Sequence, residues 1–527
     1  MLEKDLSPLA PFKVRIFRHL WGTWLVANLC MWMNDVAAAW IMTSLTPSPV
    51  WVALVQSAAT LPVFLLALPS GALADGLDRK KYFMLTQIWI SLVACVLALA
   101  TFLDILTPQL LLALIFANGI GLAMRWPVFS AILPELVGKT QLPAALSLNS
   151  VAMNISRIGG PLIAGAIIAS AGTAWVFSLN AVLSLLAAWV IARWKREHKP
   201  HPLGREPILN SIRVGVQYIA QSPQLKSVLL RIWVFFFGAS GLVALLPLVA
   251  RGMSGGGAEA FTMLLAAMGI GAILSTTLLP RLLKKFNRDG LILRATSLQT
   301  LAMLVIAQTD SLWIALPAMI LSGMTTVTVA NTLTVAFQLA LPDWVRARGM
   351  SAYFMTMMGA GACGAALWGQ LAAWSDISVS VMVAALTGFL TLALVMRWKP
   401  DSGPVGDLSP RRISEVPEPD EPPQKGQVVV SVEYLVDPAV AADFRRLMME
   451  ESRPARLRQG AVSWQLLHDI NQPGRFVELI TERSWTDLLR RFERTTAADA
   501  ELHERKMSYH MGSEPPRIFR YLLETTV

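Results

Sequence analysis

The chain has 527 residues, of which 54% are hydrophobic and 15% are charged, with a mean hydropathy of +0.51. This balance is too apolar for a soluble protein of such length. The net charge of +10 does not indicate nucleic acid as a partner, because the basic residues lie mainly in connections between apolar segments and in a mixed-charge tail. Membrane topology and anionic lipid headgroups explain that placement better.

Twelve apolar segments are long enough to cross a bilayer, which takes about 20 residues each. They lie at 18–43, 51–73, 82–103, 109–133, 144–171, 175–194, 226–250, 259–281, 290–308, 312–340, 350–373 and 378–397. Cys30, Cys95 and Cys363 each fall inside a span and have no CxxC spacing, so neither a disulfide framework, a metal site nor a cofactor is expected.

Lys and Arg concentrate in every second connection between these spans. The connections after the first, third, fifth, ninth and eleventh spans contain neither, and the connection after the seventh contains only Arg251. The positive-inside rule then places both termini in the cytoplasm. We expect a multi-pass membrane protein in contact with membrane lipids.

Five regions follow in chain order: a six-helix half at 1–194, a central cytoplasmic loop at 195–225, a second six-helix half at 226–399, a Pro-rich linker at 400–426 and a soluble domain at 427–527. Apolar spacing over 208–219 predicts a helix on the inner membrane surface. Two six-helix halves around a central site are typical of transporters that work by alternating access.

The last region predicts an α+β fold. Alternating apolar residues indicate strands at 428–434, 462–466 and 476–480, with helices at 438–451 and 485–507 and a last strand at 518–523. The order β-α-β-β-α-β is ferredoxin-like. Such a sheet has helices on one face, so its other face usually needs a partner.

The connection between the second and third spans carries a motif. Gly71, Leu73, Asp75, Arg79 and Lys80 match the pattern G-x-L-a-D-[RK]-x-G-[RK]-[RK] of the major facilitator superfamily, whereas Gly76 and Asp78 depart from it. The resemblance implies an all-α, twelve-helix transporter in which Gly71, Asp75, Asp78, Arg79 and Lys80 hold an inner gate, through helix-terminus electrostatics. The plainer alternative is a charged turn that only enforces topology.

The fifth span contains Gly160, Pro161 and Gly165 in a run similar to the exporter-associated pattern g-x-x-x-G-P-x-x-G-G, with Ser156 and Ala164 in place of glycines. Small residues allow helices to pack closely in lipid, and proline loosens the backbone where a helix bends. Packing alone is the alternative to an export motif.

Three of the charged residues within the spans are worth weighing, because charge is costly there and a functional role is the default hypothesis. Asp35 is the acidic residue well inside a span; burial favours its protonated form, as a proton carrier requires, although it could lie solvated near the outer mouth. Arg157 could bind an anionic cargo or pair internally. Arg125 is expected to snorkel to the inner interface. Ile115 stands where many proton-driven members carry arginine, which puts the usual arginine-assisted proton transfer in doubt.

Asn34, Asn118 and Asn154 are predicted to line a substrate cavity together with Arg157, although such residues also join helices. Residues 10–400, including Trp21, Trp32, Trp40 and the run Pro134-Glu135-Leu136-Val137, resemble the transmembrane secretion effectors and their enterobactin-exporter-like subgroup. The tail, with Trp485, Leu489, Arg494 and Pro515-Pro516, is similar to the antibiotic-biosynthesis monooxygenase fold, which implies a homodimer through 427–527.

The sequence therefore predicts a secondary transporter that exports small amphipathic molecules, drug-like or siderophore-like, in exchange for protons. Three competing interpretations remain open: uptake, movement of a lysolipid between leaflets, and a membrane-anchored enzyme acting through the tail. His468, His503 and His510 lack metal-ligand spacing, so a binding or dimerisation module is favoured over catalysis, and the chain is not expected to be an enzyme.

Overall fold

The computed structural model describes residues 9–76, 78–137, 141–194, 208–398, 407–411 and 426–524. Twelve helices among them are long and apolar enough to span a membrane, as predicted. They are α1 (Arg15–Leu45), α2 (Pro49–Gly76), α3 (Arg79–Phe102), α4 (Pro108–Leu136), α5 (Leu142–Ala171), α6 (Thr173–Ala192), α8 (Pro223–Gly252), α9 (Ala258–Lys285), α10 (Arg288–Gln308), α11 (Leu312–Leu339), α12 (Asp343–Trp374) and α13 (Ile377–Val395).

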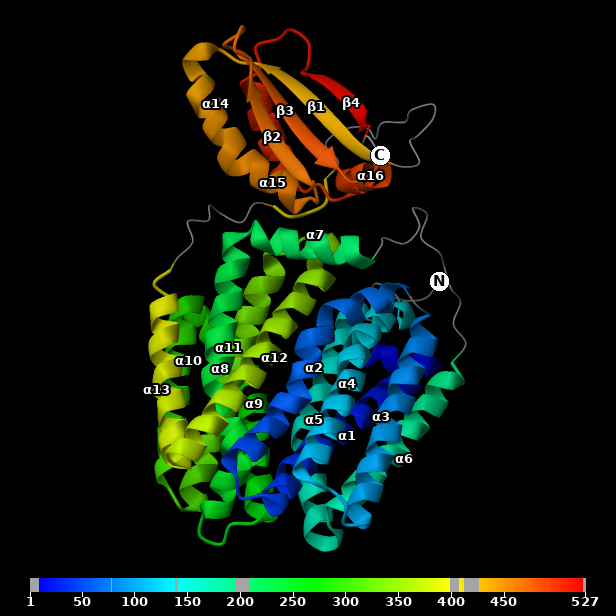
Figure 1. The fold of residues 1–527 in the computed structure, drawn as a ribbon, viewed down its shortest axis with the longest axis vertical. Coiled ribbons are helices and arrows are strands. Elements are labelled where there is room, and N and C mark those ends of the chain that lie inside the picture. The colour runs from blue at the N-terminus through cyan, green and yellow to red at the C-terminus, as the bar shows by residue number, and fades with distance from the viewer. Residues whose placement is uncertain are drawn as a thin grey trace. The chain divides into compact units, whose positions relative to one another are not determined.

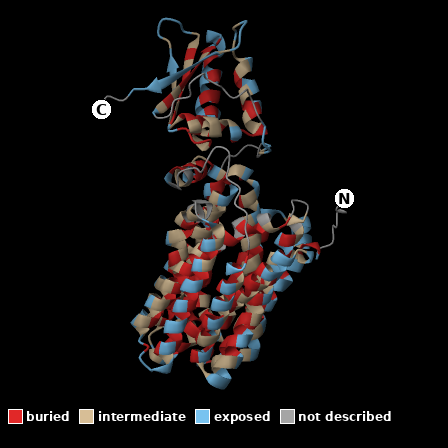
Figure 2. Cartoon of the chain, turned by 90° about the vertical axis from the view of Figure 1, so that its right-hand side faces the viewer, coloured by how far each residue is buried: buried red, intermediate tan, exposed pale blue. Residues whose placement is uncertain are grey.

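The chain divides into two compact units, each described by itself. The first comprises Met1–Lys199, Leu229–Val335 and Ser351–Trp398, which is most of the membrane region. Within it α1–α6 form one group and the later spans form another (Figure 1). Buried and exposed residues recur along each of these helices, so that one side of a helix is buried and the other is exposed (Figure 2). The exposed face carries large apolar side chains such as Leu92, Leu185 and Leu390, as a lipid-facing surface requires.

Capping residues and a glycine set the boundaries of helices at the connections that the sequence predicts. Asp78 accepts hydrogen bonds from the backbone N–H groups of Lys80 and Lys81 and so caps α3. Thr107 caps α4 in the same way, with Pro108 at the first helical position. Gly172, with φ of 93°, separates α5 from α6 by a single residue, in a left-handed conformation that favours glycine.

The two halves meet near the end of the bundle that carries the connections at 46–48, 103–107, 172, 253–257, 309–311 and 375–376, which we call the distal end. Helix α5 packs on α9 there. On the other side, the hydroxyl of Ser57 in α2 donates to the carbonyl of Ala362 in α12 (2.7 Å). One buried apolar cluster contains residues of both halves, including Val36, Ala53, Phe261 and Trp368. The distal end is therefore closed by direct packing between the halves.

The second unit comprises Pro200–Val228, Ala336–Met350 and Lys399–Val527. Its sheet has the order β2-β3-β1-β4 and is antiparallel throughout, which confirms the predicted ferredoxin-like order. The strands are β1 (Gln427–Leu435), β2 (Ser463–His468), β3 (Arg475–Glu482) and β4 (Arg517–Leu523). Helices α14 (Ala441–Leu447), α15 (Arg453–Arg458), α16 (Trp485–Glu493) and α17 (Ala497–Ser508) complete the domain, and a π-helical turn at Met448–Ser452 joins α14 to α15.

One prediction for this domain is wrong: the helix expected over 485–507 is two helices. Helix α16 ends at Glu493, and Thr496 begins α17 by exchanging hydrogen bonds with Asp499 in a capping box. The Thr-x-x-Asp pattern was present in the sequence and is a signal for a new helix start. The break frees Arg494 and Thr495 for contacts outside the helices.

The helix predicted in the central loop is present as α7 (Ile208–Ala220), and its place on the membrane surface stays a prediction. Its polar face contacts the sheet domain. Asn210 donates to Asp487 (3.0 Å), Arg213 donates to the Gly460 carbonyl (3.1 Å), and Gln217 donates to the Ala461 carbonyl (2.8 Å). In the same unit the guanidinium of Arg494 lies over the ring of Trp344, 5.0 Å from its centroid, and Tyr218 packs edge-on against that ring. The tail, α7 and the connection between α11 and α12 thus form one packed body.

Candidate transport site and gate

Three tryptophans in a row on α1 each contact an arginine of the membrane region. Trp24, Trp32 and Trp40 are eight residues apart, about 12 Å per step along a helix. Each ring has an arginine from a different helix over it. The partners are Arg125 of α4 at 5.3 Å, Arg157 of α5 at 5.9 Å and Arg251 of α8 at 5.3 Å from the ring centroids. Sequence reasoning missed this row, because the arginines come from helices far apart in the chain.

Arg125 does not snorkel, so that expectation is wrong. Its side chain is 1% exposed, donates to the carbonyl of Ala27 (3.1 Å) and lies over Trp24. Asp35, on the same helix as Ala27, is half-buried. No hydrogen bond or ion pair of the Asp35 carboxylate is seen among the described residues, so Arg125 and Asp35 do not form a closed pair.

Arg157 lies at the middle of α5, fifteen residues from its first residue and fourteen from its last. Its guanidinium is over Trp32, and no carboxylate within the described part of the chain pairs with it. Ile158, the next residue, contacts Gly269 of α9, where a Cβ would lie 2.6 Å from Ile158 Cγ1. Arg157 is thus next to the packing between the halves, at the depth where a central cargo site is expected.

The three asparagines predicted to line the cavity occupy different surroundings. Asn154 is half-buried and lies three residues before Arg157, on the same face of α5. Asn34 is 1% exposed and accepts a hydrogen bond from Asn180 of α6 (3.3 Å), so it joins two helices. Asn118 is buried on α4. Asn154 and Arg157 thus share one face of α5, whereas Asn34 joins two helices and Asn118 is buried on α4.

The glycines of the fifth-span motif touch different halves. A Cβ on Gly160 would lie 2.4 Å from Trp32 Cβ, within the first half. A Cβ on Gly165 would lie 2.2 Å from Thr262 Oγ1 of α9, in the second half. Pro161 lies between them inside α5. Gly160 lets α5 pack closely on α1 within the first half. Gly165 lets α5 pack closely on α9 of the second half, at the closed distal end.

The loop motif is described in part. Gly71 and Asp75 lie in the last turns of α2, but their side-chain surroundings lie outside the described residues. Asp78 caps α3, and Arg79 and Lys80 are its first two residues. The departure at Asp78 thus has a local structural role, since its carboxylate satisfies N–H groups that the helix leaves free.

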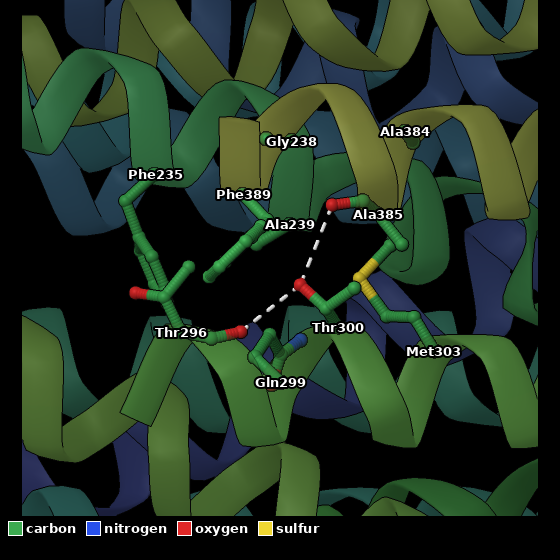
Figure 3. Close-up of a pocket in the computed structure, with 11 residues that line it drawn as sticks. Phe235, Gly238, Ala239, Thr296, Gln299, Thr300, Met303, Ala384, Ala385 and Phe389 are labelled. Carbon is green, nitrogen blue, oxygen red and sulfur yellow. Dashed lines mark hydrogen bonds between the residues drawn. The ribbon is translucent and has the colours of Figure 1, made fainter. Parts of the chain in front are cut away.

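A small cavity between α8, α10 and α13 is not suited to cargo (Figure 3). Its volume of about 10 Å³ has room for one water molecule at most. The Thr300 hydroxyl donates to the carbonyls of Thr296 and Ala385, and Gln299 is bonded to Ser322 and Thr325. Its polar groups are therefore already used to join helices. The lining residues are Phe235, Gly238, Ala239, Thr296, Gln299, Thr300, Met303, Ala384, Ala385, Gly388 and Phe389.

The interior of the tail domain holds a buried carboxylate, Glu478 of β3, which is 0% exposed. It accepts hydrogen bonds from Trp464 (2.9 Å), Tyr434 (3.1 Å) and Lys506 (3.4 Å). Burial alone would raise the pKa of Glu478, but Lys506 and Arg456 lower it below its ordinary value. Burial lowers the pKa of Lys506 to about 8, so the pair is still ionised at neutral pH. The network thus joins β3 to β1, β2 and α17.

Twelve spans in two halves, with charges at the middle of the first half, define a secondary transporter of the major facilitator superfamily. The chain belongs to the family described as transmembrane secretion effector, which matches residues 6–526. It is a multi-pass protein of the bacterial inner membrane.

Named relatives are transporters. The staphyloferrin A transporter of Staphylococcus aureus is 24% identical over 328 residues, 62% of this chain and 81% of the relative. The multidrug efflux pump Tap of Mycolicibacterium fortuitum is 28% identical over 204 residues, 36% of this chain and 49% of the pump. The macrolide efflux protein A of Streptococcus pyogenes is 24% identical over 169 residues, 32% of this chain and 40% of that protein.

Solved structures share the fold. A bacterial homologue of the human lysosomal transporter Spinster, in an inward-facing and unoccupied conformation, superposes with a TM-score of 0.56 at 16% identity, over 74% of this chain and 99% of that one. The nucleoside transporter NupG superposes with a TM-score of 0.58 at 12% identity, over 73% of this chain and 100% of that one. At these identities the likeness shows the fold alone.

Proposed function

We propose that this protein is an exporter of small amphipathic molecules, drug-like or siderophore-like, driven by proton exchange. The observation that carries the cargo site is Arg157, a cation at the centre of α5 with Trp32 beneath it and no carboxylate partner in the described residues. An intramembrane arginine normally pairs with an anion. An acidic group on the cargo would supply it, with the apolar part of the cargo against Trp32 and with Asn154 one turn away.

Direction of transport is inferred from kinship and from the motif in α5. Relatives named as a siderophore transporter and as efflux pumps support export of such molecules.

Asp35 is the proposed proton carrier. It lies on α1 inside the membrane region, three residues after Trp32, and its carboxylate has no hydrogen bond or ion pair among the described residues. Proton and cargo would thus both act at α1, and coupling would pass through movement of that helix. This differs from arginine-assisted proton transfer through the fourth helix, where the chain has Ile115.

The deciding experiment measures accumulation of fluorescent compounds and siderophores in efflux-deficient bacteria. Cells with wild type, Asp35→Asn or Arg157→Gln are compared with and without a protonophore, at matched protein abundance. We expect wild type to lower accumulation of acidic amphipathic compounds, and both variants and the protonophore to abolish that effect. Full gradient-dependent export by Asp35→Asn would exclude Asp35 as the carrier. Raised accumulation with wild type would instead identify uptake. If no compound is affected, the next assay is lysolipid transport by the reconstituted protein.

For the tail we propose an accessory, non-catalytic role: it holds α7 and the α11–α12 connection, and it pairs with a second copy. The hydrogen bonds that Glu478 accepts from Tyr434, Trp464 and Lys506 favour a structural role for this buried carboxylate, although the fold order agrees with the resemblance to antibiotic-biosynthesis monooxygenases. Strand β4 supports pairing, because it is an edge strand whose residues are all exposed, including Phe519 and Tyr521. Cross-linking of the full chain in membranes, with and without Tyr521→Glu, tests the pairing.

A further inference from the structure

Arg251 is the exception in the charge pattern of this chain. It is the sole basic residue in the six connections that the positive-inside rule places outside. The positive-inside rule does not require a basic residue in an outer connection and slightly disfavours one. A physical reason for Arg251 has to come from its contacts.

Those contacts all lie on the last turns of α1, in the other half of the transporter. The guanidinium of Arg251 donates to the carbonyl oxygen of Thr43 and to the hydroxyl of Ser44 (3.2 Å), and it lies over the ring of Trp40. The last four carbonyls of a helix have no partner within it, and they carry the negative end of the helix dipole. Arg251 thus supplies both a donor and a positive charge where α1 lacks them.

The same indole links a third helix. Phe261 of α9 stacks on Trp40, with ring centroids 6.1 Å apart and planes 19° from parallel. One residue further, Thr262 packs against Gly165 of α5. At the closed distal end α1 is therefore held by α8 and α9, in addition to the α5–α9 and α2–α12 contacts, and Arg251 is the charged contact of α1 there.

Charged contacts of this kind act as switches because they are made in one arrangement and lost in the other. The closed distal end packs buried apolar side chains of both halves and excludes water from them. Arg251 itself is exposed, so water can solvate its charge as soon as α1 moves away. The residue is thus able to hold the end shut without making its opening prohibitively costly.

We propose that Arg251 is the latch of the outer gate: it fastens the end of α1 to the second half in the inward-facing state and releases it in each cycle. It is a positioning residue, since it meets α1 and not the cargo site. This proposal rests on the proposed alternating-access exporter. Within it, Arg251 sets the equilibrium between the states with the outer end closed and open.

The test measures gate opening directly and does not need the cargo. In a chain whose three native cysteines are replaced, Ser57→Cys puts a thiol between α2 and α12, where the side chain is buried while the halves are packed. Its labelling rate with a membrane-impermeant maleimide, added outside to spheroplasts, reports how often the distal end opens. We expect Arg251→Gln to raise that rate roughly tenfold, in line with the loss of a charge-assisted hydrogen bond. Arg251→Lys should raise it less.

The matched control is Arg231→Gln on the same helix, which removes an equal charge whose partner, Asp289 of α10, is in the same half (2.9 Å). We expect its labelling rate to equal that of wild type at comparable abundance. A second, gain-of-contact test joins cysteines introduced at 44 and 251 with a short cross-linker, which should suppress labelling until the link is cleaved. Unchanged labelling in Arg251→Gln, or undiminished labelling after cross-linking, would overturn the latch. Either result leaves the export assay unaffected, so failure of the latch and failure of export are separate outcomes.

Discussion

Replacing Gly165 with alanine should open the distal gate without unfolding the protein. The added Cβ would lie 2.2 Å from Oγ1 and 2.4 Å from Cγ2 of Thr262, against 3.4–4 Å for ordinary contacts. Thr262 cannot turn away freely, because its hydroxyl donates to the Ala258 carbonyl (2.7 Å). The two halves must therefore separate at α5 and α9, or that hydrogen bond must break.

The size of the effect follows from those overlaps. Overpacking by one methyl group costs about 1–3 kcal/mol. Because the contact exists only while the distal end is closed, this cost falls on the closed state and shifts the balance towards the open state by roughly 5–150-fold. Thr262→Ala removes two of the three clashing atoms and leaves its Cβ at 2.7 Å. It should restore part of the closed population in the double variant.

The assay is thiol labelling at Ser57→Cys from outside, and the control is Gly160→Ala on the same helix. A Cβ at 160 meets Trp32 Cβ at 2.4 Å, an overlap of similar severity within one half. We expect Gly160→Ala to lower thermal stability and abundance while leaving the labelling rate unchanged. We expect Gly165→Ala to raise the labelling rate while leaving thermal stability and abundance unchanged. Equal labelling in Gly165→Ala and wild type, or equal increases in both variants, would refute the assignment of Gly165 to the gate.

Four further predictions concern the loop motif and the tail. Asp75→Asn should reduce turnover at normal abundance if Asp75 serves the inner gate, and unimpaired export would contradict that role. Glu478→Gln should destabilise the tail by about 3–5 kcal/mol, because it leaves Lys506 buried without its partner; hydrogen exchange of the β3 amides in the full chain measures this. Since the folded pKa of Glu478 is depressed, its stabilising effect should be present above its ordinary value of 4.5 and lost as pH falls below it, and a wild type as stable at pH 3 as at pH 7 would contradict the network. Trp344→Ala removes the ring under Arg494 and should speed exchange of the α7 amides, whereas unchanged exchange would argue against anchoring by the tail.

The sequence alone determined the positions of the twelve spans and the order of the tail elements. Spans can be predicted because a bilayer demands about 20 apolar residues wherever the backbone crosses it, and this demand is local in sequence. The alternation that marks β1 and β3 is local for the same reason. The split between α16 and α17 was also encoded locally, in Thr496 and Asp499, although the apolar pattern concealed it.

Only the tertiary structure decided what the intramembrane arginines do. Arg125, Arg157 and Arg251 are separated from Trp24, Trp32 and Trp40 by about a hundred residues or more, so no periodicity connects them. Likewise, Gly160 and Gly165 belong to one motif, yet one touches its own half and the other touches the opposite half. Such roles depend on which helices become neighbours, and that is settled by the packing of the whole bundle.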